Sequence, residues 1–293
     1  MEIIRTVSWM KQAVRQARSE NQVIGMVPTM GALHQGHLSL LRRARSECST
    51  VVASIFVNPA QFGPGEDLAR YPRTFAADVE KLESAGADVL FAPEAGEMYP
   101  AGFSTYVTVD GLGERLEGRS RAGHFRGVAT VVLKLFAIVQ PHFAYFGRKD
   151  AQQVRVVGRM LRDLDSDVEL AVCPIVREPD GLALSSRNAY LAPDERRAAT
   201  VLYGSLQAAR REIARGTRDA LAIQNAAGAE LAKEKLARLD YLALVDAVSF
   251  EPLARIGGEP AYLLLAAFIG KTRLIDNLLI EADPASGHPL CTL

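Results

Sequence analysis

The ten residues from Pro28 to His37 combine two glycines, two histidines and a run of backbone amides in a pattern suited to phosphate chemistry. They follow an apolar segment, Val23–Val27, that has the length and composition of a buried strand, and Pro28 is expected to end that strand. From His37 onward, apolar residues recur at helical spacing. A strand that leads through a turn into a helix start offers unpaired N–H groups and the positive end of a dipole, which together favour an anion.

The two histidines of this segment, His34 and His37, are three residues apart and would share one face of a first helical turn. Gly36 between them allows a bulky group to approach the backbone. The segment matches neither the P-loop pattern nor Gly-x-Gly-x-x-Gly. Imidazole donors beside a phosphate would stabilise the charge that moves between the attacking and leaving oxygens. The competing interpretation is that the two histidines only cap a helix of the core.

Length and composition indicate two domains and small-molecule ligands. The chain has 293 residues, 48% of them hydrophobic, and its 34 basic residues balance 34 acidic ones. This balance argues against nonspecific nucleic-acid binding as the main task. The cysteines, Cys48, Cys173 and Cys291, are far apart and show no disulfide or zinc-site spacing, so we expect reduced thiols.

No targeting or membrane segment is expected. The first residues, Met1–Trp9, lack the apolar core of a secretory signal. No apolar stretch approaches the roughly 20 residues that cross a bilayer. We therefore predict a cytoplasmic protein.

Short apolar runs alternate with amphipathic stretches from Val23 to Val176, which is typical of a parallel α/β sheet. The order predicts a Rossmann-like, doubly wound sheet that binds ligands at the carboxyl ends of its strands. The expected strands are Val23–Val27, Thr50–Val57, Ala87–Ala92, Phe143–Phe146 and Val168–Cys173, and the expected helices are Leu38–Ser46, Phe75–Ala85, Gly127–Val139 and Asp150–Leu164.

A turn signal at Arg177–Gly181 marks a hinge after this region. Beyond it, helices are expected over Pro193–Arg215 and Arg218–Leu236, followed by strands at Tyr241–Val245 and Tyr262–Ile269. We therefore predict a first domain over residues 1–176 and a smaller α+β domain over residues 177–293, with the substrate in a cleft between them.

Five further segments make the histidine motif much more specific. They are Phe56–Phe62, Tyr71–Thr74, Gly123–Val132, Phe146–Gln153 and Leu184–Asn188. With Pro28–His37 they closely resemble the pantothenate synthetases, also called pantoate–β-alanine ligases, over essentially the whole chain. The run His34-Gln35-Gly36-His37 resembles the His-x-Gly-His signature of nucleotidyltransferases and class I aminoacyl-tRNA synthetases.

The resemblance implies the ATP-dependent condensation of pantoate with β-alanine, through pantoyl adenylate, to give pantothenate, AMP and pyrophosphate. This is a step of pantothenate and coenzyme A biosynthesis. The resemblance also implies Mg²⁺ with the ATP and a homodimer.

Site residues are assigned by the same resemblance. His37, His34 and Lys149 would be catalytic, Gln61 and Gln153 would bind pantoate, and Gln61 would also bind β-alanine. The residues implied to line the ATP site are Met30, Gly31, Ala32, Leu33, His34, Gln35, Gly36, His37, Gly147, Arg148, Lys149, Asp150, Val176, Leu184, Ser185, Ser186 and Arg187.

The side-chain chemistry agrees with these roles. The mobile ammonium of Lys149 suits an α-phosphate, and an acidic residue such as Asp150 is a common ribose acceptor, although both also fit a solvated helix start. The amides of Gln61 and Gln153 combine donors and acceptors without charge, which suits a hydroxy acid. Gln152 is interpreted as a helix-surface residue and left outside the site.

The segment after the hinge offers further phosphate ligands. Ser185, Ser186 and Arg187 carry hydroxyls and a forked guanidinium that suit β and γ phosphates, although Ser and Asn runs also cap local turns. The main chain of Val176 would meet adenine. An acidic cluster expected after Tyr71–Thr74 is thin, with Asp78 following two alanines, so Mg²⁺ would be held mainly by ATP oxygens and water.

Two alternatives stay open at this point. The first is another adenylyltransferase of the same fold with a different acceptor, which would call for a more basic acceptor pocket than Gln61 and Gln153 provide. The second is a nonenzymatic nucleotide-binding or RNA-associated module, against which the neutral charge weighs.

Overall fold

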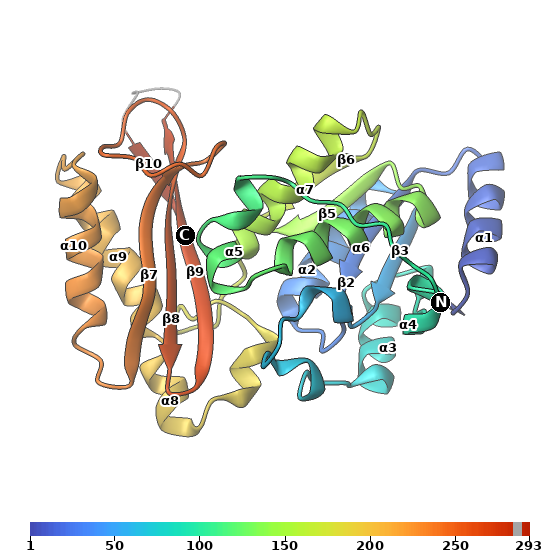
Figure 1. The fold of residues 1–293 in the computed structure, drawn as a ribbon, viewed down its shortest axis with the longest axis horizontal. Coiled ribbons are helices and arrows are strands. Elements are labelled where there is room, and N and C mark those ends of the chain that lie inside the picture. Colours follow the sequence, from blue (N-terminus) through green and yellow to red (C-terminus); the bar gives the residue numbers. More distant parts are fainter. Residues whose placement is uncertain (284–288) are drawn as a thin grey trace. The chain divides into compact units, whose positions relative to one another are not determined.

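The computed structural model describes residues 1–283 and 289–293 (Figure 1). The described chain divides into two compact units. Unit 1 comprises Met1–Arg148 and Gln152–Pro174, and unit 2 comprises Lys149–Ala151 and Ile175–Leu293. The main chain therefore leaves unit 1 for three residues at Lys149 and returns to it at Gln152.

Unit 1 is built on a parallel six-stranded sheet with the strand order β1-β4-β3-β2-β5-β6. Apart from β1 at one edge, the order runs outward in both directions from β2, so the sheet is doubly wound, as predicted. Its strands are β1 (Glu2–Ile4), β2 (Ile24–Thr29), β3 (Thr50–Ile55), β4 (Val89–Phe91), β5 (Phe143–Gly147) and β6 (Glu169–Cys173).

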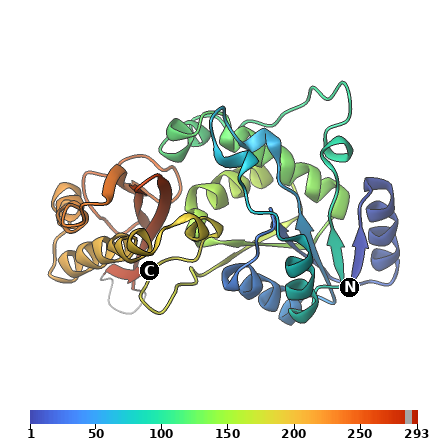
Figure 2. The ribbon, with the colours of Figure 1, turned by 90° about the horizontal axis from the view of Figure 1, so that it is seen from below.

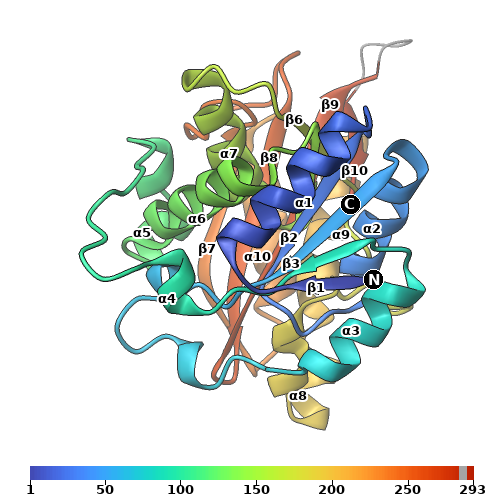
Figure 3. The ribbon, with the colours of Figure 1, turned by 90° about the vertical axis from the view of Figure 1, so that its right-hand side faces the viewer.

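Helices cover both faces of this sheet. Figure 3 shows α2 and α3 on one face and α6 and α7 on the other, with α1 beside α6. The apolar runs of β2 and β3 are buried on both faces for this reason. The helices of unit 1 are α1 (Val7–Ser19), α2 (Gln35–Glu47), α3 (Phe75–Ser84), α4 (Ala95–Met98), α5 (Glu117–Ser120), α6 (His124–Val139) and α7 (Ala151–Asp163).

The expected end of the first predicted strand is wrong. Pro28 does not end its strand, because β2 continues to Thr29 and pairs Pro28 with Ser54 of β3. On its other side β2 pairs with β5 only at Gly25 and Met26. Pro28 therefore lies beyond the two-sided part of the ladder, where a missing N–H group costs little. The first strand and helix, β1 and α1, were not predicted.

Unit 2 contains an antiparallel four-stranded sheet in its described part, with the order β10-β9-β8-β7. Helices α9 and α10 pack on each other and against this sheet (Figure 2). Leu206, Ile223, Leu263 and Leu278 are completely buried in the resulting core. The elements are α8 (Pro193–Ala198), α9 (Val201–Ala214), α10 (Ala220–Leu231), β7 (Ala237–Asp246), β8 (Ala261–Ile269), β9 (Thr272–Ala282) and β10 (Pro289–Thr292).

The predicted fold class, a Rossmann-like sheet with a smaller α+β portion, is confirmed. The predicted helix Pro193–Arg215 is in fact two helices, because the chain leaves α8 at Ala199 and Thr200 before α9 begins. The strands β9 and β10 were not predicted. β9 lies inside its sheet with apolar and polar residues mixed, so it shows no clear alternation along the chain.

Candidate active site

The loop between β2 and α2 carries the two histidines. Its backbone takes two successive left-handed residues, Gly31 with φ 82° and Ala32 with φ 51°. Glycine adopts this conformation freely, whereas in Ala32 it costs about 1 kcal/mol or more. The chain then enters α2 at Gln35 with His34 as the N-cap.

The structure brings His34 and His37 together at the helix start. Their ring centroids are 4.1 Å apart. His34 Nδ1 accepts from the Gly36 N–H at 3.2 Å, and His37 Nδ1 accepts from the His34 N–H at 3.3 Å. Both rings are thus oriented through Nδ1 by the first turn of α2. This arrangement is a reciprocal helix cap, which confirms the capping interpretation. A helix start of this kind also favours an anion, so the cap does not conflict with a phosphate site.

Asp78 of α3 holds this loop through its carboxylate. The two oxygens accept from the backbone N–H groups of Ala32 and Leu33, each at 2.8 Å, and Thr74 Oγ1 donates to the same carboxylate at 3.0 Å. Lys81, one turn further along α3, donates to the Leu33 carbonyl at 2.8 Å. Asp78 is only 1% exposed. Its oxygens therefore serve the histidine loop, a role that no local sequence signal indicated.

Gln61 is a buried residue of the short 3₁₀ turn that follows β3, Pro59–Gln61. Asn58 Nδ2 donates to Gln61 Oε1 at 3.0 Å, and Gln61 Nε2 lies 3.1 Å from the sulfur of Met30. With its oxygen engaged by Asn58, the amide turns its NH₂ group toward the residue that precedes the histidine loop. The structure thus brings two predicted site residues, Gln61 and Met30, into contact.

Helix α6 supports the Gln61 turn from the other side. His124 Nδ1 lies 2.8 Å from the Gln61 carbonyl oxygen, and Arg121 Nη1 lies 3.0 Å from His124 Nε2. A carbonyl can only accept, so Nδ1 carries the proton and Nε2 accepts from the guanidinium. Burial, with the Arg121 cation adding to it, lowers the pKa of His124 to about 4. His124 is therefore a neutral structural donor, and it was not predicted.

Close packing completes this support. Asn58 Nδ2 also donates to the Gly127 carbonyl at 3.1 Å, and a Cβ atom on Gly127 would overlap the Ala60 carbonyl. Tyr99 donates to Asn58 Oδ1 at 2.8 Å, and burial raises the pKa of Tyr99 to about 12, so that this donor keeps its proton. The turn that carries Gln61 is consequently fixed on three sides.

The two neighbouring glutamines of α7 differ from each other. Gln153 is half-buried, and its side chain has no hydrogen-bond partner among the described residues. Gln152 is 3% exposed, accepts from the Glu117 N–H at 3.2 Å, and donates to the carbonyls of Leu112 at 2.8 Å and Arg115 at 2.9 Å. The surface interpretation of Gln152 is thus wrong, because this side chain satisfies the irregular backbone before α5.

The predicted phosphate residues near β5 divide between the two units. Gly147 ends β5 and Arg148 is buried in the 3₁₀ turn Arg148–Asp150, both in unit 1. Lys149 belongs to unit 2, with its ammonium 3.9 Å from the carboxylate of the exposed Asp150. Asn277 Nδ2 donates to the Lys149 carbonyl at 3.0 Å.

The remaining predicted residues lie on one hairpin of unit 2 and the turn that follows it. The Leu184 N–H donates to the Val176 carbonyl at 3.0 Å and closes the hairpin. Ser185 then caps the turn Ser186–Tyr190, its Oγ accepting from the Arg187 N–H at 3.3 Å. Val176, Leu184 and the Ser-Ser-Arg run are therefore parts of one local structure.

Metal and membrane features are absent from the part of the chain that the structure describes. No group of three or more His, Cys, Asp or Glu residues there has the geometry to hold a metal ion. None of its helices is long and apolar enough to cross a membrane.

Comparison with known proteins decides the family. The sequence profile of the pantoate–β-alanine ligases matches residues 2–279. Proteins named pantothenate synthetase from Koribacter versatilis (strain Ellin345) and Thermotoga neapolitana are each 53% identical to this chain, over 96% of it and 97% and 100% of their own lengths. The chain belongs to the pantoate–β-alanine ligase family. The resemblance drawn from the ordered motifs is thereby confirmed.

Solved structures of the ligase family share the fold. A crystal structure of pantothenate synthetase from Thermus thermophilus superposes with a TM-score of 0.89 at 48% identity, covering 95% of this chain and 99% of that one. The pantoate–β-alanine ligase of Francisella tularensis, complexed with beta-gamma ATP and β-alanine, superposes with a TM-score of 0.77 at 36% identity, covering 95% and 97%. A ligase of this family therefore binds both ATP and β-alanine.

Proposed function

We propose that this chain joins pantoate to β-alanine with ATP as co-substrate, releasing pantothenate, AMP and pyrophosphate. The observation that carries the proposal is the family match over residues 2–279, on a chain whose His34 and His37 rings meet at a helix start. The helix start suits the phosphates of ATP because its first N–H groups and its dipole favour negative charge.

In the first step, a carboxylate oxygen of pantoate attacks the α-phosphorus of ATP, and the bond to the bridging oxygen of the β-phosphate breaks. Negative charge grows on the departing pyrophosphate. We assign His34 and His37 to stabilising this charge through hydrogen bonds from their rings, which the helix start orients through Nδ1. The Lys149 ammonium would stabilise the negative charge of the α-phosphate through the reaction, and Asp150 would accept a hydrogen bond from a ribose hydroxyl.

In the second step, the amine of β-alanine attacks the carbonyl carbon of pantoyl adenylate. The bond to the phosphate oxygen breaks, AMP leaves, and the amine loses a proton. Gln61 and Gln153 would hold pantoate, and Gln61 would also meet β-alanine. Gln61 presents its NH₂ group as a donor, while Gln153 has no protein partner among the described residues and so keeps its amide for the substrate.

The remaining predicted residues would complete the nucleotide site. Gly31 to Gly36 and Gly147 would approach the phosphates through the backbone, and Ser185, Ser186 and Arg187 would bind the outer phosphates. Val176 and Leu184, joined by a backbone hydrogen bond, would line adenine.

Mg²⁺ would enter with ATP and screen the triphosphate. The protein does not offer Asp78 for this purpose, because both its oxygens accept hydrogen bonds from the histidine loop. ATP oxygens and water would therefore supply most ligands. A homodimer and a cytoplasmic location stay predictions.

The test is an assay of AMP, pyrophosphate and pantothenate release with ATP, Mg²⁺, pantoate and β-alanine. Pantothenate and AMP should form in equal amounts, and His37→Ala should lower kcat by about 100-fold or more. Pyrophosphate release that needs an acceptor other than pantoate would contradict the proposed substrate while keeping adenylyl transfer.

A further inference from the structure

Two polar residues stand side by side in β9 where apolar ones would be expected. Asp276 and Asn277 are 3% and 1% exposed, and they pair across the sheet with Leu265 and Leu264 of β8. A buried carboxylate and a buried amide weaken a sheet unless other groups of the protein use their hydrogen bonds. The hydrogen-bond partners of Asp276 and Asn277 therefore indicate what these two side chains hold in place.

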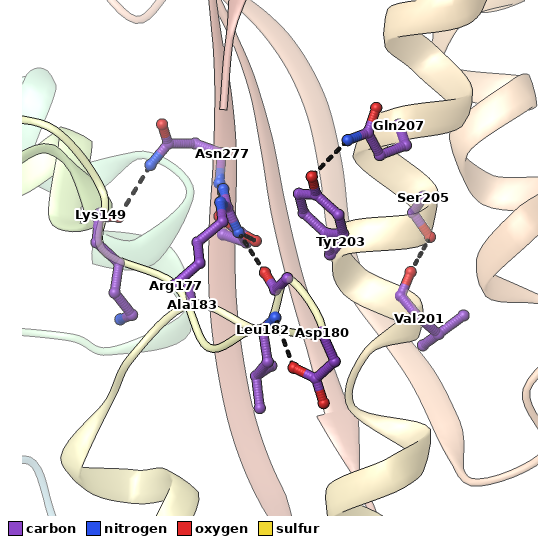
Figure 4. A network of polar contacts seen from close by, with 12 residues as sticks. Lys149, Arg177, Asp180, Leu182, Ala183, Val201, Tyr203, Ser205, Gln207 and Asn277 are labelled. Atoms are coloured by element: carbon purple, nitrogen blue, oxygen red, sulfur yellow. Dashed lines mark hydrogen bonds and ion pairs between the residues drawn. The ribbon is translucent and has the colours of Figure 1, made fainter.

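Asn277 holds the main chain at Lys149. Its Nδ2 donates to the Lys149 carbonyl at 3.0 Å, linking residues 128 positions apart, and Figure 4 shows its side chain pointing toward Lys149. Lys149–Ala151 is the short segment of unit 2 that interrupts unit 1 along the chain. This hydrogen bond holds the backbone of Lys149. The Lys149 ammonium takes no part in it.

Asp276 holds the hairpin that leads to Ser185. Its oxygens accept from Arg177 Nη1 at 2.6 Å and Nη2 at 2.9 Å, in a two-point ion pair whose carboxylate is buried and whose guanidinium is half-buried. Arg177 Nη1 also donates to the Gly181 carbonyl across the hairpin at 3.0 Å. The guanidinium lies over the ring of Tyr203, 4.9 Å from its centroid (Figure 4).

The hairpin itself is tightly determined. Besides the bond between Val176 and Leu184, the Glu178 N–H donates to the Leu182 carbonyl at 2.8 Å. Gly181 has φ 93°, and a Cβ atom there would overlap the ring of Tyr203. An ion pair at the base of such a hairpin sets the direction in which the chain enters the turn at Ser185.

We infer that Asp276 and Asn277 are positioning residues for catalysis: from adjacent places on one strand, they fix the Lys149 backbone and the hairpin that delivers Ser185–Arg187. This inference rests on the proposed function, which assigns both segments to ATP. The rigid sheet would give two separate parts of the nucleotide site a common support.

The experiment compares kcat and both KM values of the full-length protein with those of Asn277→Ala and Asp276→Asn. We expect kcat to fall about 10- to 100-fold and the KM for ATP to rise. The KM for pantoate should not change, because Gln61 and Gln153 belong to unit 1. Asp240→Asn is the matched control, since Asp240 of the same sheet also pairs with an arginine, Arg273 at 2.7 Å, but its side chain is 24% exposed and contacts neither proposed nucleotide segment in that pair. It should keep wild-type kinetics.

A double variant separates positioning from general stability. If Asn277 acts through Lys149, then Asn277→Ala should lower kcat far less in a Lys149→Ala background than in the wild type. Should Asn277→Ala fail to fold, Asn277→Ser replaces it, because the shorter side chain keeps a polar group but loses the reach to the Lys149 carbonyl.

The outcomes are distinct. An inactive wild type would overturn the proposed function and this inference together. An active wild type, with Asn277→Ala no slower than Asp240→Asn or with fully additive effects in the double variant, would overturn the inference alone.

Discussion

The Asp78 carboxylate accepts a hydrogen bond from the Leu33 N–H at 2.8 Å, so a helix 45 positions further along the chain holds the loop that carries both histidines. A second bond of the same length comes from Ala32, whose left-handed backbone turns its N–H toward the carboxylate. Asp78 therefore stabilises a strained loop conformation that would relax without it.

We expect Asp78→Asn to lower both stability and activity. The amide has only one acceptor oxygen, so its NH₂ group would face the N–H of either Ala32 or Leu33, and that N–H would lose its hydrogen bond. Unfolding should need about 3 kcal/mol less free energy, and kcat/KM should fall about 100-fold. Asp88→Asn is the control. Asp88 also accepts a hydrogen bond from a backbone N–H, that of Val51 at 2.7 Å, but it does not contact the histidine loop in that bond. Chemical denaturation and steady-state kinetics measure the two effects. Wild-type kinetics in Asp78→Asn would show that the loop keeps its shape unaided.

Gly127→Ala should disturb Gln61, the proposed pantoate residue, rather than the proposed nucleotide residues. The new Cβ would push on the Ala60 carbonyl and move the turn Pro59–Gln61 away from α6. The KM for pantoate should rise about tenfold or more, with a smaller change for ATP. Gly204→Ala, in helix α9, is the matched control because its Cβ would make an ordinary contact with Glu230 at 3.8 Å. Equal KM changes for both substrates would contradict the assignment.

The neighbouring residues Gln152 and Gln153 should respond in opposite ways to replacement by alanine. Gln152→Ala leaves three backbone groups without their partner and should lower the free energy of unfolding by about 2 kcal/mol. Gln153→Ala removes no hydrogen bond among the described residues, so stability should stay nearly constant. Its effect should instead be a rise of about tenfold in the KM for pantoate, from one lost hydrogen bond. Thermal unfolding and pantoate titration of each variant test the contrast.

His124 should make the protein less stable in acid. Burial, aided by the Arg121 cation, lowers its pKa from 6.5 to about 4 in the folded state, so the unfolded chain binds a proton more readily. The stabilisation is complete above pH 6.5, declines as the pH falls toward 4, and then levels off. The full difference is about 3 kcal/mol.

Denaturation curves of the wild type and His124→Asn across this pH range provide the measurement. Asparagine keeps an N–H donor toward the Gln61 carbonyl but does not titrate, so the gap in stability between the two proteins should change by this amount between pH 6.5 and 4. Parallel pH profiles would mean that His124 is protonated in the folded state as easily as in the unfolded one.

Several features were predictable from the sequence because they depend on neighbours along the chain. The apolar strand before Pro28 and the helical spacing after His37 report local periodicity, and two histidines three apart must share a helix face. The ordered motifs from Pro28–His37 to Leu184–Asn188 identified the family. Strand ends were less certain, since Pro28 stays in β2 only because β5 pairs with the other end of that strand.

Only the tertiary structure decided how these residues are held. From the sequence, Asp78 was only the remnant of an acidic cluster too thin to hold Mg²⁺, and in the structure it binds the loop at Ala32 and Leu33. Gln152 was interpreted as a surface residue and is buried. Asn277 reaches Lys149 across 128 positions. A side chain's hydrogen-bond partners from distant segments depend on how the sheets and helices pack, and no local periodicity records that packing. The sequence therefore predicted which groups do the chemistry and identified the family, and the tertiary structure showed which groups hold those residues in place.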